Sequence, residues 1–210
     1  MIELTNIEKS FSDTPLFTLK EYTIKDGNIT ALYGPSGCGK TTLLNMISLL
    51  DFRYKGEIKL DGETIRKGRK AEKIRQNLFS YVFSQDYLID YLTPRENIIL
   101  SCQINKKKVP ERIYKNIEEE GMTPLLDKNI SQLSQGEKQR FSIFRALALE
   151  KKYLIMDEPT AHLDKENSIR ICEILQKQKQ SGKTIIIACH DQNMKPYFDS
   201  ILEFKNHEII

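Results

Sequence analysis

Four short, largely apolar runs alternate along the chain with longer segments in which apolar and polar residues are mixed. Runs of this length are typical of strands covered on both faces in a parallel sheet. Segments with helical spacing separate several of them; the clearest begins after Asp164, a good N-terminal cap, and ends at Gly182. The pattern therefore predicts an α/β domain. The four runs are 29–33, 79–83, 153–156 and 184–189.

The segment 86–132 has a different pattern. It is charged and rich in asparagine, contains Pro110 and Pro124, and includes no stretch that predicts a strand. We interpret it as a helical subdomain inserted into an α/β core of residues 1–85 and 133–210, within one domain of residues 1–210. At the end of the chain, "SILEFKNHEII" predicts two short strands around a turn at residues 205–207.

Composition narrows the class of protein. The 32 Lys and Arg against 29 Asp and Glu leave a net charge of +3, and the basic run at residues 106–108 has no flanking aromatic residues, so we expect no nucleic-acid partner. Four widely spaced cysteines without a CxxC pair indicate reduced thiols of a cytoplasmic protein. No apolar run approaches the roughly 20 residues of a membrane helix, so a membrane role would require another chain.

Residues 34–41, "GPSGCGKT", match GxxxxGK[ST] between a predicted strand and a predicted helix. Glycines allow the backbone to curl until successive N–H groups point at one anion, and the helix adds its positive N-terminal end. The stretch therefore predicts a polyphosphate-binding loop. Its members are Gly34, Pro35, Ser36, Gly37, Cys38, Gly39, Lys40 and Thr41.

Side chains at the end of this loop suit a nucleotide with Mg²⁺. Lys40 would reach the β and γ phosphates, Thr41 would place its hydroxyl on Mg²⁺, and Thr42 would support the α phosphate. Cys38 occupies a permissive position, where we expect a small filler rather than a reactive thiol. Kinases, GTPases and ATPases all use such a loop, so it does not choose among them.

The stretch "YLIMDEPT" places Asp157 and Glu158 at the C-terminal end of a buried strand, where ligands bind in open α/β sheets. Asp157 suits a water-mediated contact to Mg²⁺, and Glu158 suits a base that orients the attacking water. Guanine recognition is disfavoured, because "NKKK" at Asn105 lacks the aspartate of NKxD.

The stretch "QLSQGEKQRFSIFRAL" contains a capping box, in which Ser134 and Glu137 begin a helix. Gly136 in its first turn and the free helix N-terminus also form an anion site, which the chain's own phosphate loop does not need. A second nucleotide contact is therefore implied.

With these residues in place, the chain resembles the ATP-binding cassette (ABC) family, the ATPase subunits of ABC transporters, over almost its whole length. Residues 34–41 match the Walker A motif, 133–137 ("LSQGE") the LSGGQ signature and 155–158 the Walker B motif. "AHLD", ending in Asp164, resembles the D-loop, and His190 after "TIIIAC" resembles the switch histidine. Phe11 precedes the Walker A motif at a spacing similar to that of the family's adenine-stacking aromatic residue.

Two positions depart from the family pattern. Ser84 stands where a glutamine usually reaches Mg²⁺ and the attacking water, and Gln85 follows one residue late. We expect the loop to shift so that Gln85 serves as metal ligand and catalytic residue, because a serine hydroxyl is too short to span from the strand end to the metal. Gln135 replaces the first glycine of the signature, a change that the retained Gly136 should make tolerable.

The resemblance implies a P-loop NTPase core with a mainly parallel sheet, flanking helices, an N-terminal antiparallel part and an inserted helical subdomain. It implies hydrolysis of ATP with Mg²⁺ in a head-to-tail dimer with a second ATPase chain. It also implies an integral membrane permease as partner, with the chain on the inner face of the cell membrane. "SLLD" and "GEIKLDGE" are similar to the branch that exports peptides, antibiotics or lipoproteins. A soluble ABC ATPase acting on a partner such as an iron-sulfur scaffold is the alternative.

Overall fold

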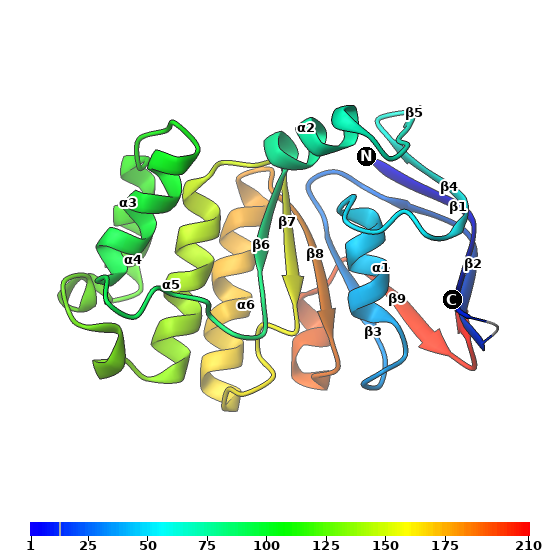
Figure 1. Cartoon of the computed structure of the whole chain (residues 1–210). Helices are drawn as coiled ribbons and strands as arrows, with labels where there is room; N and C mark the ends of the chain where they lie inside the picture. Colours follow the sequence, from blue (N-terminus) through cyan, green and yellow to red (C-terminus); the bar gives the residue numbers. More distant parts are fainter. Residues whose placement is uncertain (13) are drawn as a thin grey trace.

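The computed structural model describes residues 1–12 and 14–210. Its strands form a ten-stranded sheet in the order β5-β4-β1-β2-β10-β9-β3-β8-β7-β6, in which one half is parallel and the other mainly antiparallel (Figure 1). The strands are β1 (Ile2–Phe11), β2 (Thr14–Ile24), β3 (Ile29–Tyr33), β4 (Lys55–Leu60), β5 (Glu63–Thr64), β6 (Phe79–Val82), β7 (Tyr153–Asp157), β8 (Thr184–Cys189), β9 (Ser200–Lys205) and β10 (Glu208–Ile209).

The parallel half consists of β9, β3, β8, β7 and β6. In β8, Ile185 and Ile187 face one hydrophobic core while Ile186 and Ala188 face the other, and all four side chains are fully buried. Coverage on both faces explains why these strands appear in the sequence as uninterrupted apolar runs. The mixed α/β fold with a P-loop core is confirmed, and β6 ends one residue earlier than the sequence predicts.

Helices cover the two faces of the parallel half. On one face, α1 (Lys40–Ile47) packs between β7, β8 and the antiparallel half, and on the other lie α5 (Gln135–Ala148) and α6 (Lys165–Gln180) (Figure 1). The short α2 (Arg69–Leu78) precedes β6. Among the described residues, no helix combines the length and apolarity needed to cross a membrane.

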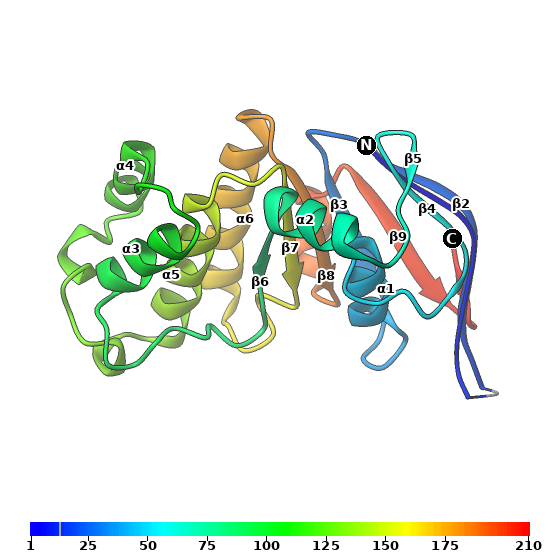
Figure 2. The ribbon, with the colours of Figure 1, turned by 45° about the horizontal axis from the view of Figure 1, so that its top comes forward.

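Residues 86–132 contain α3 (Pro94–Ile104), α4 (Glu111–Glu119) and the 3₁₀ turns η1 (Thr123–Leu125) and η2 (Ile130–Gln132), without a strand. They lie at the end of the molecule opposite the antiparallel strands (Figure 2). Both α3 and α4 contact α5, the helix that follows the segment. Apolar side chains of this segment, among them Ile98 and Ile117, belong to the same core as α5 and α6, so the division into a core and an inserted subdomain remains a prediction.

Candidate nucleotide-binding and catalytic site

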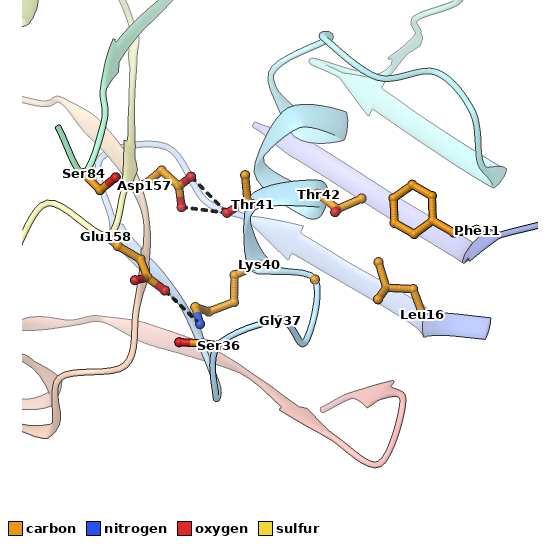
Figure 3. A pocket seen from close by; sticks show the side chains of 11 residues that line it. Phe11, Leu16, Ser36, Gly37, Lys40, Thr41, Thr42, Ser84, Asp157 and Glu158 are labelled. Carbon is orange, nitrogen blue, oxygen red and sulfur yellow. Dashed lines mark hydrogen bonds and ion pairs between the residues drawn. The ribbon is translucent and has the colours of Figure 1, made fainter. Parts of the chain in front are cut away.

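A cavity of about 350 Å³ opens beside the loop between β3 and α1 (Figure 3). At one end stand the side chains of Ser84, Asp157 and Glu158, and at the other end those of Phe11 and Leu16. The phosphate-loop residues lie between these ends. The predicted residues that line the cavity are Phe11, Ser36, Gly37, Gly39, Lys40, Thr41, Thr42, Asp157 and Glu158.

The backbone of the loop fits an anion. Gly37 and Gly39 have φ angles of +82° and +110°, a region that favours glycine. A Cβ atom at Gly39 would lie 2.7 Å from a ring carbon of Phe17, so this position has no room for a side chain. Helix α1 begins at the next residue with no side-chain cap, and its first N–H groups are therefore free to bind a phosphate.

Lys40 is buried at the base of the loop. Its ammonium donates to the carbonyl oxygens of Gly34, at 2.8 Å, and Pro35, at 2.9 Å. It also lies 3.1 Å from Oε1 of Glu158, with only 4% of the Lys40 side chain exposed. The positive charge is thus fixed between the phosphate loop and the Walker B carboxylates.

Thr41 and Asp157 form an oxygen-rich pair. The Thr41 hydroxyl lies 3.0 Å from Oδ1 and 2.9 Å from Oδ2 of Asp157, to which it can donate (Figure 3). Burial raises the pKa of Asp157, and the hydrogen bond from Thr41 only partly offsets this effect. A hydroxyl and a carboxylate beside a phosphate loop are the hard oxygen donors that Mg²⁺ takes together with phosphate oxygens, so the residues present fit the ion.

Glu158 adopts a φ angle of +46°, which is uncommon for a residue with a side chain. Its N–H donates to the carbonyl oxygen of Ala188, at 2.9 Å, and so ties the turn after β7 to β8. The carboxylate lies between the Lys40 ammonium and Nδ1 of His190, which is 3.5 Å from Oε2. The turn therefore directs this carboxylate toward the phosphate loop rather than into the sheet.

Ser84 lies in the cavity wall, whereas Gln85 is not among the residues that line it. The loop is fastened on both sides by α5. Gln139 donates to the carbonyl oxygen of Phe83, at 2.9 Å, and Arg145 donates to those of Asp86 and Tyr87. Only Ser84 and Gln85 lie between the two points of attachment, so the assignment of the role to Gln85 stays a prediction.

The signature residues lie away from this cavity on the same chain. Ser134 accepts from the N–H of Glu137, and Glu137 accepts from the N–H of Ser134, which is the predicted capping box at the start of α5. Gly136 is buried so closely against α6 that a Cβ atom there would lie 2.5 Å from Oδ1 of Asn167. Asp164 caps α6 through the N–H of Asn167. None of these residues lines the cavity beside the phosphate loop.

Sequence reasoning missed Leu16, which lines the cavity beside Phe11. The two side chains come from neighbouring antiparallel strands, β1 and β2, whose register includes an irregularity between Lys9 and Ser10. Leu16 directly precedes Phe17 in β2 and does not belong to the buried alternation of Phe17 and Leu19. A strand position becomes part of a site through pairing, which no motif encodes.

A phosphate loop between a buried strand and a helix, with an Asp-Glu pair at the end of β7, defines a P-loop nucleoside triphosphatase. The sequence model of the ABC transporter family matches residues 19–161, and the chain belongs to that family. It therefore hydrolyses ATP, with ATP and Mg²⁺ as the bound groups, as the sequence analysis expects.

Curated relatives match over the whole chain. An ABC transporter ATP-binding protein of Methanocaldococcus jannaschii is 33% identical, with 100% of this chain and 98% of that protein covered. The lipoprotein-releasing system ATP-binding protein LolD of Aquifex aeolicus is 32% identical, with 100% and 96% covered. The macrolide export ATP-binding/permease protein MacB of Campylobacter jejuni is 33% identical, and the chain spans 34% of its length.

Solved structures agree with this assignment. The structure of cbiO1 from Clostridium perfringens, described as part of an ABC transporter complex, has a TM-score of 0.86 and 30% identity, covering 100% of this chain and 86% of that one. A dimeric ATP-binding cassette in a post-hydrolysis state with ADP and Pi has a TM-score of 0.82 and 30% identity, with 100% and 96% covered.

The roles of Ser84 and Gln85 can be separated by substitution. We expect Gln85→Ala to lower the ATPase rate, measured with the membrane partner present, by about threefold or more, and Ser84→Ala to change it little. Only the glutamine side chain is long enough to bring a carbonyl oxygen from the strand end to Mg²⁺. The affinity for ATP should change little in either variant, because the adenine and the phosphates are bound elsewhere. The opposite ranking of the two rates would assign the role to Ser84.

Proposed function

We propose that two copies of this chain pair head to tail around two MgATP and drive transport through a separate membrane permease. The observation that carries the proposal is the separation, within one chain, of the phosphate loop from the signature residues Ser134, Gly136 and Glu137. In the head-to-tail arrangement, the uncapped α1 of one chain and the α5 N-terminus of the other would bind the same triphosphate.

Each residue then has a definite task. The loop N–H groups and Lys40 bind the β and γ phosphates, while Thr41 and Asp157 hold Mg²⁺. When bound there, Mg²⁺ would neutralise charge on the β and γ phosphates and on the ADP leaving group. Glu158 orients the attacking water and accepts its proton, and His190, 3.5 Å from the same carboxylate, contacts the γ phosphate.

ATP joins the two chains because the γ phosphate contacts both of them, and hydrolysis removes that contact. A ligand shifts a conformational equilibrium only by its difference in affinity between the two states. Bound ATP would thus stabilise the closed dimer, and ADP would release it. Asp164, at the start of α6, would lie at the interface between the chains, and Phe11 would stack on the adenine.

The transport direction is proposed from the relatives. LolD and MacB are named for lipoprotein release and macrolide export, and both match the whole of this chain. We therefore place this chain on the inner face of the cell membrane, where residues 86–132 would contact a permease. The substrate class would be a peptide, an antibiotic or a lipid-like molecule.

A large side chain introduced among the signature residues tests the head-to-tail pairing. We expect Gln135→Trp to abolish ATP-dependent dimerisation, measured by analytical ultracentrifugation, because the large side chain at the exposed start of α5 would keep the partner's nucleotide away. ATP binding to the single chain should persist. The control is Gln180→Trp, at the exposed C-terminal end of α6. This variant should dimerise normally. Normal dimerisation of Gln135→Trp would exclude this interface.

A further inference from the structure

Lys9 carries a charge inside the molecule, with only 3% of the residue exposed. Its ammonium donates to Oδ2 of Asp51, at 2.8 Å, and to the carbonyl oxygen of Arg53, at 2.6 Å. The same ammonium lies 5.0 Å from the ring centroid of Phe11. A buried charge is costly unless it is paired and hydrogen-bonded. The Asp51 carboxylate and the Arg53 carbonyl oxygen supply these partners for the Lys9 ammonium.

The two residues of the Lys9–Asp51 ion pair belong to different structural elements of the site. Lys9 and Phe11 are two residues apart on β1, and the Lys9 ammonium lies over the Phe11 ring. Asp51 follows α1, the helix that begins at Lys40, and its N–H donates to the carbonyl oxygen of Asn45 within α1, at 3.1 Å. The ion pair therefore joins the strand that carries the aromatic ring to the helix that carries the phosphate loop.

The Asp51 carboxyl group is ionised at neutral pH. Burial works against the charge on Asp51, but the hydrogen bonds from Lys9 and from the N–H of Arg53 outweigh it and hold the pKa of Asp51 below its usual value. The Lys9 ammonium that donates to this carboxylate lies over the Phe11 ring, where a cation is attracted to the electron-rich face. Phe11 nonetheless remains 53% exposed, which leaves ring surface for a ligand.

We propose that Lys9, held by Asp51, is a positioning residue that sets the distance between the Phe11 ring and the phosphate loop. A base stacked on the ring and a triphosphate on the loop can then be bound at once. The inference rests on the stacking of adenine on Phe11 in the proposed function. It adds that this contact depends on an ion pair that does not line the cavity beside the phosphate loop, between residues that no nucleotide-binding motif includes.

A merely structural ion pair and a positioning pair differ in what they do to two ligands. ATP engages both the ring and the loop, whereas inorganic tripolyphosphate engages only the loop. Loss of a structural pair would weaken both ligands or neither. Loss of a positioning pair would weaken ATP alone, and only in a chain that still carries the ring.

The experiment compares dissociation constants for ATP and tripolyphosphate, by calorimetry on the full chain. In Lys9→Met/Asp51→Asn, which removes both charges together, we expect ATP to bind about fivefold more weakly, a fraction of what a base–aromatic stack contributes, and tripolyphosphate to bind as before. Phe11→Ala should show the same selectivity, and adding the pair substitution to it should cause no further loss. The control is Glu8→Gln/Lys55→Met, an exposed ion pair on β1 and β4, which should change neither ligand.

Two further variants keep the test decisive. Lys9→Arg retains the charge and should restore ATP affinity, and Asp51→Asn alone, which retains an acceptor for Lys9, should give a smaller selective loss even if the double variant does not fold. Equal loss of both ligands, or no loss of ATP, in a folded pair variant would overturn the positioning role. If Phe11→Ala has no selective effect on ATP, the stacking contact itself is wrong. That result is distinguishable from failure of the positioning role alone, in which Phe11→Ala still weakens ATP selectively.

Discussion

Replacing Glu158 with glutamine is expected to lower the rate of ATP hydrolysis by about 10²- to 10⁴-fold, the range that a positioned general base contributes. Glutamine has nearly the same size and retains an oxygen that can accept from the Lys40 ammonium, now 3.1 Å from Oε1. It cannot accept a proton from water. The step that suffers is therefore the attack on the γ phosphate, and MgATP binding should survive.

Single-turnover ATPase assays measure the rate, and a separate binding titration measures the affinity for MgATP. Because binding without hydrolysis should hold the closed state, ATP is also expected to trap Glu158→Gln as a stable dimer. Glu173→Gln, an exposed carboxylate on α6, is the matched control and should hydrolyse ATP normally. Wild-type turnover in Glu158→Gln would show that another group acts as the base.

Lys40→Ala is expected to weaken MgATP binding by at least about 10- to 100-fold, since hydrogen bonds to charged groups contribute roughly 1.5–3 kcal/mol each. The substitution removes the single cation of the phosphate loop. It also leaves Glu158 without the ion pair that opposes its charge at the site of the γ phosphate. Electrostatic attraction for the triphosphate is thereby replaced by repulsion from two carboxylates.

Titration with a fluorescent ATP analogue measures this affinity, and thermal unfolding checks that the variant folds. The carbonyl oxygens of Gly34 and Pro35 lose a donor in this variant, so its stability has to be compared with that of the wild type. Lys25→Ala, an exposed lysine after β2, serves as control and should bind MgATP as the wild type does. Unchanged affinity in Lys40→Ala would disprove the assignment of the phosphate loop.

The sequence predicted the parallel strands well because burial on both faces leaves an uninterrupted apolar run, as at residues 184–189. It did not predict α2, whose only buried residue is Ala71, or the short β5, because neither has a full apolar face. In β1 the alternation is interrupted at Asn6, with a φ angle of +50°, and by the irregular pairing at Lys9. Exposed or irregular elements therefore depend on tertiary context that a local pattern cannot contain.

The candidate site divides in the same way. Residues 34–42 and 157–158 were predictable because each set belongs to one continuous strand end and turn, so sequence neighbours are also spatial neighbours. Leu16 was not predictable, because strand pairing brings it beside the cavity. The Lys9–Asp51 pair was not predictable either, because its two residues are 42 positions apart in the sequence. The choice between Ser84 and Gln85 depends on a one-residue register in a loop, which sequence spacing alone does not fix.

Helix α5 connects the signature residues at its N-terminus to a contact with α3 at its other end. Its 14 residues span about 21 Å, from the signature at its N-terminus to Ala148, whose carbonyl oxygen accepts from Cys102 of α3. A rigid rod pivoting at that far end by about 5° would sweep its tip through roughly 2 Å. Such a displacement is enough to carry a hydrogen bond of 2.9 Å out of range. A small rotation imposed on α3 would thus be magnified into the making or breaking of a contact at Ser134.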